Sequence, residues 1–388
     1  MKKIIFNTDS LIMGGAEKIA IEYLKLLNES KKFKIFLLIN EDNGIERNIL
    51  LNEIPPEIRY EYVVEKDIIK KLNSYREKKK NNIFAKILYN YFLYKRRKNY
   101  KKNIVKILKK EKYDYLMDFY CKVPIEVIDE RAICWLHSSL KKIKNKSFYK
   151  EKFQKAKTII VITEDMKKEF YHNFPFLKDK VKILYNFFDI SEIKRKSIEY
   201  SEIDKKFQKL LDDNYILSCS RIDKNKDLGT LIKAFKIVKE KKFSIKEKLY
   251  IVGDGPEKKE IEKLVNKLKL QKEVIFLGTQ LNPFIWMKNA ELFVHSSKKE
   301  GFGMVLVEAM ICETLVIATD CPVGPREILE NGKNGILVEP ENIKQLADKI
   351  EIYLLNKKLR TPFIENANTR IIEFSRENIK NSILRILE

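Results

Sequence analysis

The chain has 388 residues and a formal net charge of +23, with 44 % hydrophobic and 11 % aromatic residues. This composition can bury sizeable cores, which excludes a disordered chain, and the length predicts two or three domains. The apolar runs are far shorter than the ~20 residues of a membrane span. The first apolar run is also too short for a signal peptide, so we expect neither a span nor an export signal.

Short β-branched and aromatic runs alternate with helical patterns along the whole chain. Such repeated βα units predict parallel sheets with helices on both faces, and the near-continuous apolar character of the runs is typical of buried parallel strands. We therefore predict an α/β protein with two doubly wound, Rossmann-like domains, separated near the polar stretch 189–214. The first series of predicted strands covers 3–8, 34–39, 60–64, 113–119, 132–137, 158–163 and 181–185, and the second covers 215–220, 248–252, 274–277, 291–296, 315–319 and 335–338.

Residues 66–112 carry most of the excess charge. They hold 18 Lys and Arg against 3 acidic residues, whereas 213–372 holds 27 against 22. A basic amphipathic helix favours an anionic membrane surface. A solvated helical face is the plainer interpretation. A third interpretation, nucleic-acid binding, is not supported by any nucleic-acid-binding signature in the sequence. Large apolar residues recur at helical spacing between the basic ones: Ile83, Phe84, Ile87, Leu88, Tyr91, Phe92 and Tyr94.

Two features of the first series are candidate ligand contacts. Gly14 and Gly15 follow the first strand, at the start of a helix whose N-terminal N–H groups can face an anion. A plain tight turn explains this pair equally well. His137 ends the predicted strand 132–137, where it can touch a bound ligand; the alternative is a hydrogen-bonded histidine near the core.

Three turns of the second series carry charged or glycine-rich motifs. Arg221 and Lys226 follow the strand 215–220 and can converge on a diphosphate, because Arg supplies a fork and Lys a point charge. The turn at 253–256 reads as a strand-to-helix turn that forms the floor of a cleft, with its proline in the first helical turn. The stretch 320–328 predicts a rigid wall, with Asp320 and Arg326 as further ligand candidates.

The most specific motif runs from Glu300 to Glu308, two carboxylates with seven residues between them. We predict Glu300 in a loop and Glu308 on the following helix, whose N-terminal amides would face a phosphate. Carboxylates accept hydrogen bonds from sugar hydroxyls, so one acid can bind a hexose and the other a ribose. The turn between them consists of Gly301, Phe302, Gly303, Met304 and Val305.

The cysteines and histidines give no metal-binding pattern. Five cysteines are scattered without a CxxC motif, and the chain has three histidines. This usage predicts a reducing cytoplasm and no bound metal.

Together these motifs resemble family 4 of the retaining glycosyltransferases, whose GT-B architecture has two Rossmann-like domains facing across a cleft. The resemblance follows the same order along roughly the whole chain. It implies an acceptor-binding domain at 1–190, a nucleotide-sugar-binding domain at 191–372, and a last helix at 373–388 that crosses back to the first domain. It is carried by the turn at 14–17, His137, Arg221 with Lys226, the turn at 253–256, and the Glu300 and Glu308 pair, which matches the family's EX7E signature.

The resemblance also implies a role for each candidate residue. Arg221 and Lys226 would bind the diphosphate and stabilise the departing nucleotide. Glu300 would bind sugar hydroxyls, and Glu308 the ribose. His137 would contact the donor sugar near its anomeric centre. The remaining donor-site residues would line the sugar and phosphates, mainly through their backbone: Gly15, Gly301, Phe302, Gly303, Met304 and Val305.

The expected reaction follows from the same resemblance. A hexose or N-acetylhexosamine would move from a UDP-sugar to a lipid-linked glycan acceptor, with retention and without metal or another cofactor. Residues 320–328 resemble members that build bacterial surface polysaccharides such as capsule or lipopolysaccharide. The segment 66–112 would hold the enzyme peripherally on the inner face of the cell membrane.

Two other function classes stay open. A UDP-sugar 2-epimerase can share the two-domain architecture, but it would need acid and base residues of its own. A non-catalytic basic protein that binds membrane or RNA would have no use for Arg221, Lys226 and Glu300 together.

Overall fold

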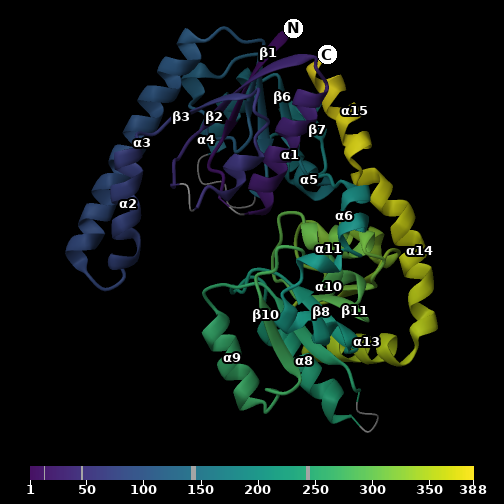
Figure 1. The fold of residues 1–388 in the computed structure, drawn as a ribbon. Coiled ribbons are helices and arrows are strands. Elements are labelled where there is room, and N and C mark those ends of the chain that lie inside the picture. The colour runs from purple at the N-terminus through teal and green to yellow at the C-terminus, as the bar shows by residue number, and fades with distance from the viewer. Residues whose placement is uncertain (13, 45–46, 141–145, 242–244) are drawn as a thin grey trace. The chain divides into compact units, whose positions relative to one another are not determined.

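The computed structural model describes residues 1–12, 14–44, 47–140, 146–241 and 245–388. The chain divides into two compact units (Figure 1). The first unit consists of residues 1–184 together with 382–388, and the second consists of residues 185–381. Each unit is built around one parallel β-sheet.

The first unit has a seven-stranded sheet in the order β3-β2-β1-β4-β5-β6-β7. The strand order reverses between β1 and β4, which pair in parallel. In open α/β sheets such a reversal opens a crevice outside the carboxyl ends of the strands, where ligands bind. The strands are β1 (Lys2–Thr8), β2 (Phe33–Ile39), β3 (Arg59–Tyr62), β4 (Tyr115–Asp118), β5 (Ala132–Leu136), β6 (Thr158–Val161) and β7 (Val181–Ile183).

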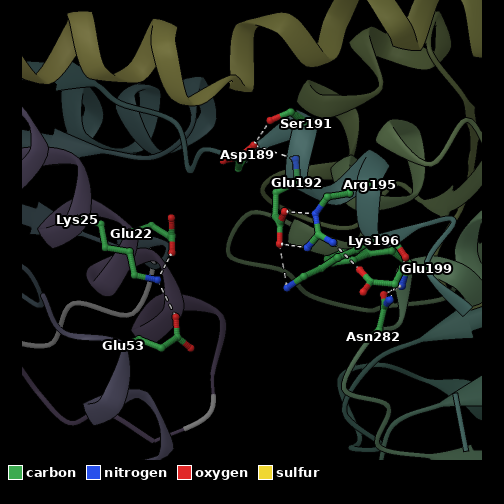
Figure 2. A network of polar contacts seen from close by, with 11 residues as sticks. Glu22, Lys25, Glu53, Asp189, Ser191, Glu192, Arg195, Lys196, Glu199 and Asn282 are labelled. Atoms are coloured by element: carbon green, nitrogen blue, oxygen red, sulfur yellow. Dashed lines mark hydrogen bonds and ion pairs between the residues drawn. The ribbon is translucent and has the colours of Figure 1, made fainter. Parts of the chain in front are cut away.

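Helices connect these strands, and side chains cap several of them. The Asn82 side chain accepts a hydrogen bond from the Ala85 amide at the start of α3, and Thr163 does the same for Met166 in α5. Lys25 of α1 bridges Glu22 and Glu53, at 3.0 and 2.8 Å (Figure 2). The described helices are α1 (Gly15–Glu29), α2 (Lys66–Lys78), α3 (Ile83–Lys110), α4 (Lys146–Lys155) and α5 (Glu164–Asn173).

The second unit has a six-stranded sheet in the order β10-β9-β8-β11-β12-β13. Its order reverses between β8 and β11, so both units have the strand order of a Rossmann fold. The strands are β8 (Tyr215–Cys219), β9 (Lys248–Val252), β10 (Val274–Gly278), β11 (Leu292–His295), β12 (Val316–Thr319) and β13 (Ile336–Val338).

Helices α8 and α13 pack against one another and contribute many of the buried residues of the second core. Leu231 and Phe235 of α8 and Leu346 and Ile350 of α13 are fully buried there. The described helices are α6 (Ile190–Lys196), α7 (Lys205–Gln208), α8 (Leu228–Glu240), α9 (Lys258–Lys267), α10 (Phe284–Lys288), α11 (Met304–Ile311), α12 (Pro325–Ile328), α13 (Ile343–Leu355), α14 (Thr361–Arg370) and α15 (Arg376–Leu387).

Every strand predicted from the sequence is present, although several ends differ. The run 113–119 is a strand only over 115–118, and the run 60–64 is a strand over 59–62. The apolar residues beyond these strands are buried in neighbouring turns, as Val63, Val64 and Phe119 are. Burial makes strand and turn residues look alike in sequence, so the existence of a strand is easier to predict than its ends.

The stretch 189–214, whose polar sequence suits a linker together with a solvent-facing helix, is fixed to the second unit (Figure 2). Asp189 caps α6, and Arg195 binds Glu192 at 2.8 Å and Glu199 at 2.5 Å. Asn282 donates to the Lys196 carbonyl at 2.9 Å, which ties α6 to the loop before α10. These polar residues therefore anchor the start of the second unit.

The last helix, α15, spans the division between the units, because residues 382–388 group with the first unit. Its end is held there by two donors, since the Tyr115 hydroxyl and the Lys2 ammonium both bond the Leu387 carbonyl. The amphipathic pattern over 374–387 predicts this helix, and the structure begins it at Arg376.

Candidate functional site

The loops that follow β8 and β11 lie at the strand-order reversal of the second sheet. The β8 loop carries Arg221 and Lys226, and the β11 loop carries Glu300. Four hydrogen bonds join or brace these loops. Ser296 donates to the Lys226 carbonyl at 2.9 Å, and Ser297 donates to the Asn225 carbonyl at 3.1 Å. The Lys298 amide donates to that same Asn225 carbonyl at 2.7 Å, and Thr319 donates to the Ser297 carbonyl.

Glu300 is the centre of a charged cluster between these loops. Its Oε1 lies 2.5 Å from Nζ of Lys226 and 2.6 Å from Nε2 of His295. The Glu300 side chain is buried, and burial alone would raise its pKa. The hydrogen bond and charge of His295, with the charge of Lys226, outweigh burial and lower the pKa of Glu300 to about 2. Glu300 is therefore a carboxylate at neutral pH, held as a hydrogen-bond acceptor.

His295 belongs to this cluster, although the sequence gives it no role. It is the last residue of β11 and is 1 % exposed. The sequence does contain a signal for it, because a polar residue that ends an otherwise apolar buried strand projects where ligands bind. The spacing of five residues between His295 and Glu300 does not by itself predict that the loop folds back and brings the two side chains into contact.

Arg221 lies in the same β8 loop, but its side chain is 72 % exposed. Its Nε is 4.0 Å from Oδ2 of Asp223, a weak surface contact. The structure thus brings Lys226 and Glu300 together and leaves the Arg221 guanidinium facing solvent.

The turn at 253–256 supports the Arg221 turn through close backbone contact. A Cβ on Gly253 would lie 2.0 Å from the Ser220 carbonyl oxygen, and one on Gly255 would lie 2.3 Å from that of Ile222. The Ile222 amide donates to the Asp254 carbonyl at 2.9 Å. Glycine is needed here because two backbones touch. Pro256 precedes α9, which begins at Lys258, so it is not in the first helical turn as predicted.

The segment after Glu300 turns into α11 as predicted. Gly303 is the N-cap of this helix and has a φ of +101°, which favours glycine. Met304 and Val305 form the first turn, and Glu308 lies in the helix one turn further on. The other two residues of the turn precede the N-cap, with Gly301 partly exposed and Phe302 buried.

The stretch 320–328 contacts this turn. A Cβ on Gly324 would lie 1.8 Å from the Phe302 carbonyl oxygen, so the two backbones are in contact. Asp320 and Arg326 form an ion pair with each other, in which Nε of Arg326 lies 3.0 Å from Oδ1 of Asp320. Each of the two predicted ligand candidates therefore already has a partner of opposite charge.

His137 and Gly15 belong to the first unit. Gly15 begins α1, directly after the β1 loop, and His137 directly follows β5. The His137 ring packs on Phe119 at 4.3 Å and is parallel to Trp135 at 5.9 Å. Burial lowers the pKa of His137 to about 3, against the smaller raising effect of a hydrogen bond to the Phe119 backbone. The ring is therefore neutral near pH 7, and its Nε2 is buried without a hydrogen-bond partner among the described residues.

The first unit also contains a buried charge pair, which no motif in the sequence predicts. Lys152 and Asp118 are both fully buried, with Nζ 2.7 Å from Oδ2. Cys121 and Cys134 lie beside Asp118, so their donor atoms gather within 4.8 Å of one another. The Lys152 ammonium also donates to the Cys121 and Val123 carbonyls at 2.9 and 2.8 Å. A lysine thus holds the position that a cation would need, and we assign no metal there.

Comparison with known proteins identifies the family. A family model described as glycosyl transferases group 1 matches residues 199–370, which include both loops of the charged cluster. HepE from Anabaena, solved with UDP and glucose, has a TM-score of 0.74 and 21 % identity, with 100 % of this chain and 99 % of that chain covered. The likeness in structure supports the GT-B fold, with two Rossmann-like parallel-sheet domains.

Two curated relatives extend the comparison. The N-acetylgalactosamine-N,N'-diacetylbacillosaminyl-diphospho-undecaprenol 4-alpha-N-acetylgalactosaminyltransferase of Campylobacter jejuni is 30 % identical over 256 residues, which are 66 % of this chain and 67 % of that protein. The poly(ribitol-phosphate) alpha-N-acetylglucosaminyltransferase of Staphylococcus aureus is 29 % identical over 244 residues, 63 % of this chain and 46 % of that protein. The matches thus span about half to two thirds of these relatives. The match to the family model, together with the match to the Campylobacter jejuni relative, shows that the chain belongs to the group 1 glycosyl transferases.

Proposed function

We propose that this protein is a retaining glycosyltransferase of family 4, with Glu300 and Glu308 as its EX7E pair. It transfers a hexose or N-acetylhexosamine from a UDP-sugar to a lipid-linked glycan acceptor in the synthesis of a bacterial surface polysaccharide or glycolipid. The observation that carries the proposal is the ion pair of Lys226 with Glu300, which lies where the second sheet reverses its strand order.

The donor-binding roles follow from the chemistry of these side chains. Lys226 and the exposed Arg221 supply two positive charges on one loop for a diphosphate. Glu300 is ionised and already contacts His295 through one oxygen, and it accepts hydrogen bonds from sugar hydroxyls. Glu308 binds the ribose. The backbone from Gly301 to Val305 lies against the sugar and phosphates at the start of α11.

The transfer itself is a displacement on one face of the sugar. The bond from the anomeric carbon to the diphosphate oxygen breaks, and the acceptor oxygen bonds to that carbon from the same side. The acceptor proton passes to the departing phosphate oxygen. Arg221 and Lys226 stabilise the charge that develops on the diphosphate. With a pKa of about 2, Glu300 has no proton to give, so its role is to position the sugar.

His137 and Gly15 contribute to the site from the first unit in this proposal. The neutral imidazole of His137 forms a hydrogen bond with a donor-sugar hydroxyl near the anomeric carbon, through the unpaired Nε2. Gly15 brings the start of α1 next to the diphosphate.

The names of relatives support the choice of donor and acceptor. The Campylobacter jejuni relative is named for a sugar linked to diphospho-undecaprenol, and HepE was solved with UDP. A lipid-linked acceptor requires the enzyme to work at a membrane, and the net positive segment 66–112 suits an anionic surface. We therefore propose a peripheral position on the inner face of the cell membrane.

The test combines donor binding with transfer. Thermal unfolding is measured with UDP-glucose, UDP-galactose, UDP-N-acetylglucosamine, UDP-N-acetylgalactosamine and GDP-mannose, because a ligand that binds the folded state raises its melting temperature. UDP release from the stabilising donor is then measured with a bacterial lipid extract as acceptor. We expect Glu300→Gln and Lys226→Gln to lower UDP release at least 100-fold, and the nearby surface change Lys298→Gln to preserve it.

The same samples separate the alternatives. If the donor incubated without acceptor shows an epimerised sugar by NMR, the protein is an epimerase and the proposal is wrong. If none of the nucleotide-sugars shifts the melting temperature, donor binding itself is refuted.

A further inference from the structure

The helices α2 and α3 form a hairpin that belongs to the first unit and lie side by side (Figure 1). On α3, five large apolar residues are 48 % to 80 % exposed. Their spacing of one, three and four residues puts them on one face of the helix, within about 100° of arc. They are Ile83, Phe84, Ile87, Tyr91 and Tyr94. We call this set the apolar face of α3.

The apolar face is not needed to hold the hairpin together. Leu88 and Phe92, which the sequence places in the same stripe, are half-buried instead. The Phe92 ring stacks on Tyr75 of α2 with centroids 5.9 Å apart. Packing between the two helices therefore uses the other side of α3 and leaves the apolar face to solvent. Exposed apolar residues that gather on one face mark an interaction site.

A groove between the two helices adjoins this face. It has a volume of about 330 Å³ and is lined by four lysines: Lys71, Lys95, Lys98 and Lys102. Within the described part of the chain, none of the four forms an ion pair with an acidic side chain. Glu65 and Asp67 also line the groove, but a Glu65 oxygen already accepts from the Asn99 side-chain amide at 2.6 Å. The groove therefore offers unpaired positive charge.

The lysines and the apolar face share one side of α3. At 100° per residue, Lys95, Lys98 and Lys102 project within about 60° of arc that overlaps the apolar face. The first half of this side is thus apolar and aromatic, and the second half is basic. Lys95 Nζ lies 5.0 Å from the Tyr91 ring, where the two halves meet.

We propose that this side of the α2–α3 hairpin docks on an anionic lipid bilayer. The apolar face of α3 inserts among the acyl chains near the headgroups, and the lysine groove takes a lipid phosphate. Aromatic and aliphatic residues with flanking lysines are the combination that a bilayer interface favours. The inference rests on the peripheral membrane position proposed above and names the surface that makes the contact, and it depends on the hairpin and not on the donor site. A nucleic acid would use the lysines but leave the apolar face exposed.

The hairpin also contains basic residues that have no part in docking. Arg96 is on the opposite side of α3, where it forms ion pairs with Glu41 and, at 3.9 Å, with Asp9. Its charge is compensated within the first unit. The docking surface is therefore a defined face and not the whole basic segment. Among the described helices, none has the length and apolar content needed to cross a bilayer, so docking would be peripheral.

The test uses the full chain and co-sedimentation with vesicles of phosphatidylcholine alone or mixed equally with phosphatidylglycerol. The first variant combines Ile83→Asn, Phe84→Ser and Ile87→Asn and leaves the net charge unchanged. Its control combines Ile198→Asn, Leu281→Asn and Ile372→Asn, which are exposed apolar residues of the second unit. We expect the first variant to lose at least ten-fold in affinity for the anionic vesicles and the control to bind as the wild type does.

A second pair of variants tests the groove. Lys95→Gln, Lys98→Gln and Lys102→Gln are combined and compared with Lys258→Gln, Lys259→Gln and Lys263→Gln on α9, which remove the same net charge. We expect the groove variant to lose the preference for phosphatidylglycerol and the α9 variant to keep it. Equal losses in both would mean that net charge alone drives binding, and the proposal would be wrong.

Two further measurements make the outcomes distinct. Circular dichroism and the melting-temperature shift with UDP check that each variant is folded and that the donor site is intact. A variant that keeps its UDP response but loses vesicle binding supports docking whatever the transferred sugar is. If the apolar-face variant binds vesicles as well as the wild type does, or if the groove lysines matter only for a single-stranded RNA oligonucleotide, the proposal fails.

Discussion

One oxygen of Glu300 contacts two basic side chains, since its Oε1 lies 2.5 Å from Lys226 Nζ and 2.6 Å from His295 Nε2. The cation expected on the diphosphate and the acid expected on the sugar are thus already in contact with each other. Donor binding would exchange part of this ion pair for contacts to phosphate and hydroxyl groups. His295 would keep Glu300 ionised and oriented during that exchange.

Replacing Lys226 by methionine tests this relationship. Lys226→Met removes the charge that bonds Glu300, so the pKa of Glu300 rises from about 2 and the diphosphate loses a cationic ligand. Hydrogen bonds to charged groups contribute about 1.5–3 kcal/mol. UDP affinity measured by calorimetric titration should therefore fall by about ten- to 100-fold.

The matched control for this change is Lys298→Gln, on the same pair of loops. Lys298 is exposed and forms ion pairs with Glu341 at 2.8 Å and with Asp227 at 3.6 Å, away from Glu300. We expect its UDP affinity to stay within about two-fold of wild type, as for a surface ion pair. Unchanged UDP binding by Lys226→Met would show that Lys226 is not a diphosphate ligand.

The sequence was enough to predict the strands because buried parallel strands are continuous apolar runs. It was also enough to put Glu300 in a loop and Glu308 on a helix, because a glycine-rich turn separates them. The sequence does not predict contacts between residues that are far apart along the chain. Lys152 and Asp118 are 34 positions apart, and neither lies in a recognisable motif. The helical pattern of α3 likewise gave one stripe, and only packing against α2 shows which of its residues remain exposed.

Gly255 offers a second prediction, which concerns the backbone below Arg221. In Gly255→Ala the new Cβ would lie 2.3 Å from the Ile222 carbonyl oxygen, and the neighbouring atoms are backbone that cannot rotate away. Overpacking of this kind lowers the free energy of unfolding by about 1–3 kcal/mol. We expect the melting temperature to fall by about 3–10 °C, and UDP affinity to fall as the Arg221 turn shifts.

Gly44→Ala is the comparison for this substitution. Gly44 has a φ of +88° but nothing within 4 Å of its Cβ position, so alanine there adds backbone strain without a collision. The free energy of unfolding should fall by about 1–2 kcal/mol. UDP affinity should be unchanged, because Gly44 lies in the first unit. A Gly255→Ala protein with wild-type UDP affinity would argue against any role of this turn in donor binding.

The buried pair in the first unit gives a third prediction. Lys152→Met leaves the Asp118 carboxylate buried without its ammonium partner, and breaking a buried pair typically costs about 3–5 kcal/mol. The free energy of unfolding, measured with urea, should fall by about that amount.

Adding Asp118→Asn to Lys152→Met should recover part of this loss. Asparagine removes the unpaired charge. Its single Oδ1 can still accept from one of the two amides that bond Asp118, which are Lys122 at Oδ1 (2.8 Å) and Val123 at Oδ2 (3.0 Å). If the double variant is instead less stable by the sum of both single losses, then the two side chains contribute independently and the ion pair is not what stabilises this turn.

His137 supplies the last prediction, a dependence of stability on pH. The pKa of His137 is lowered from its ordinary 6.5 to about 3 in the folded protein, because the ring is buried. The unfolded chain therefore binds a proton near pH 6.5 that the folded protein takes up only near pH 3. The stability contributed by the neutral ring is present above pH 6.5 and is lost as the pH falls toward 3, by up to about 1.4 kcal/mol per pH unit.

His137→Gln removes this titration, so its stability should fall less steeply between pH 6.5 and 5, where carboxylates are still charged. Urea unfolding at intervals of half a pH unit gives the two slopes. His172→Gln is the control, because His172 is an exposed residue in the last turn of α5. Parallel slopes for the wild type and His137→Gln would mean that His137 accepts its proton in the folded protein, and it would then be a cation at the site and not a neutral hydrogen-bonding group.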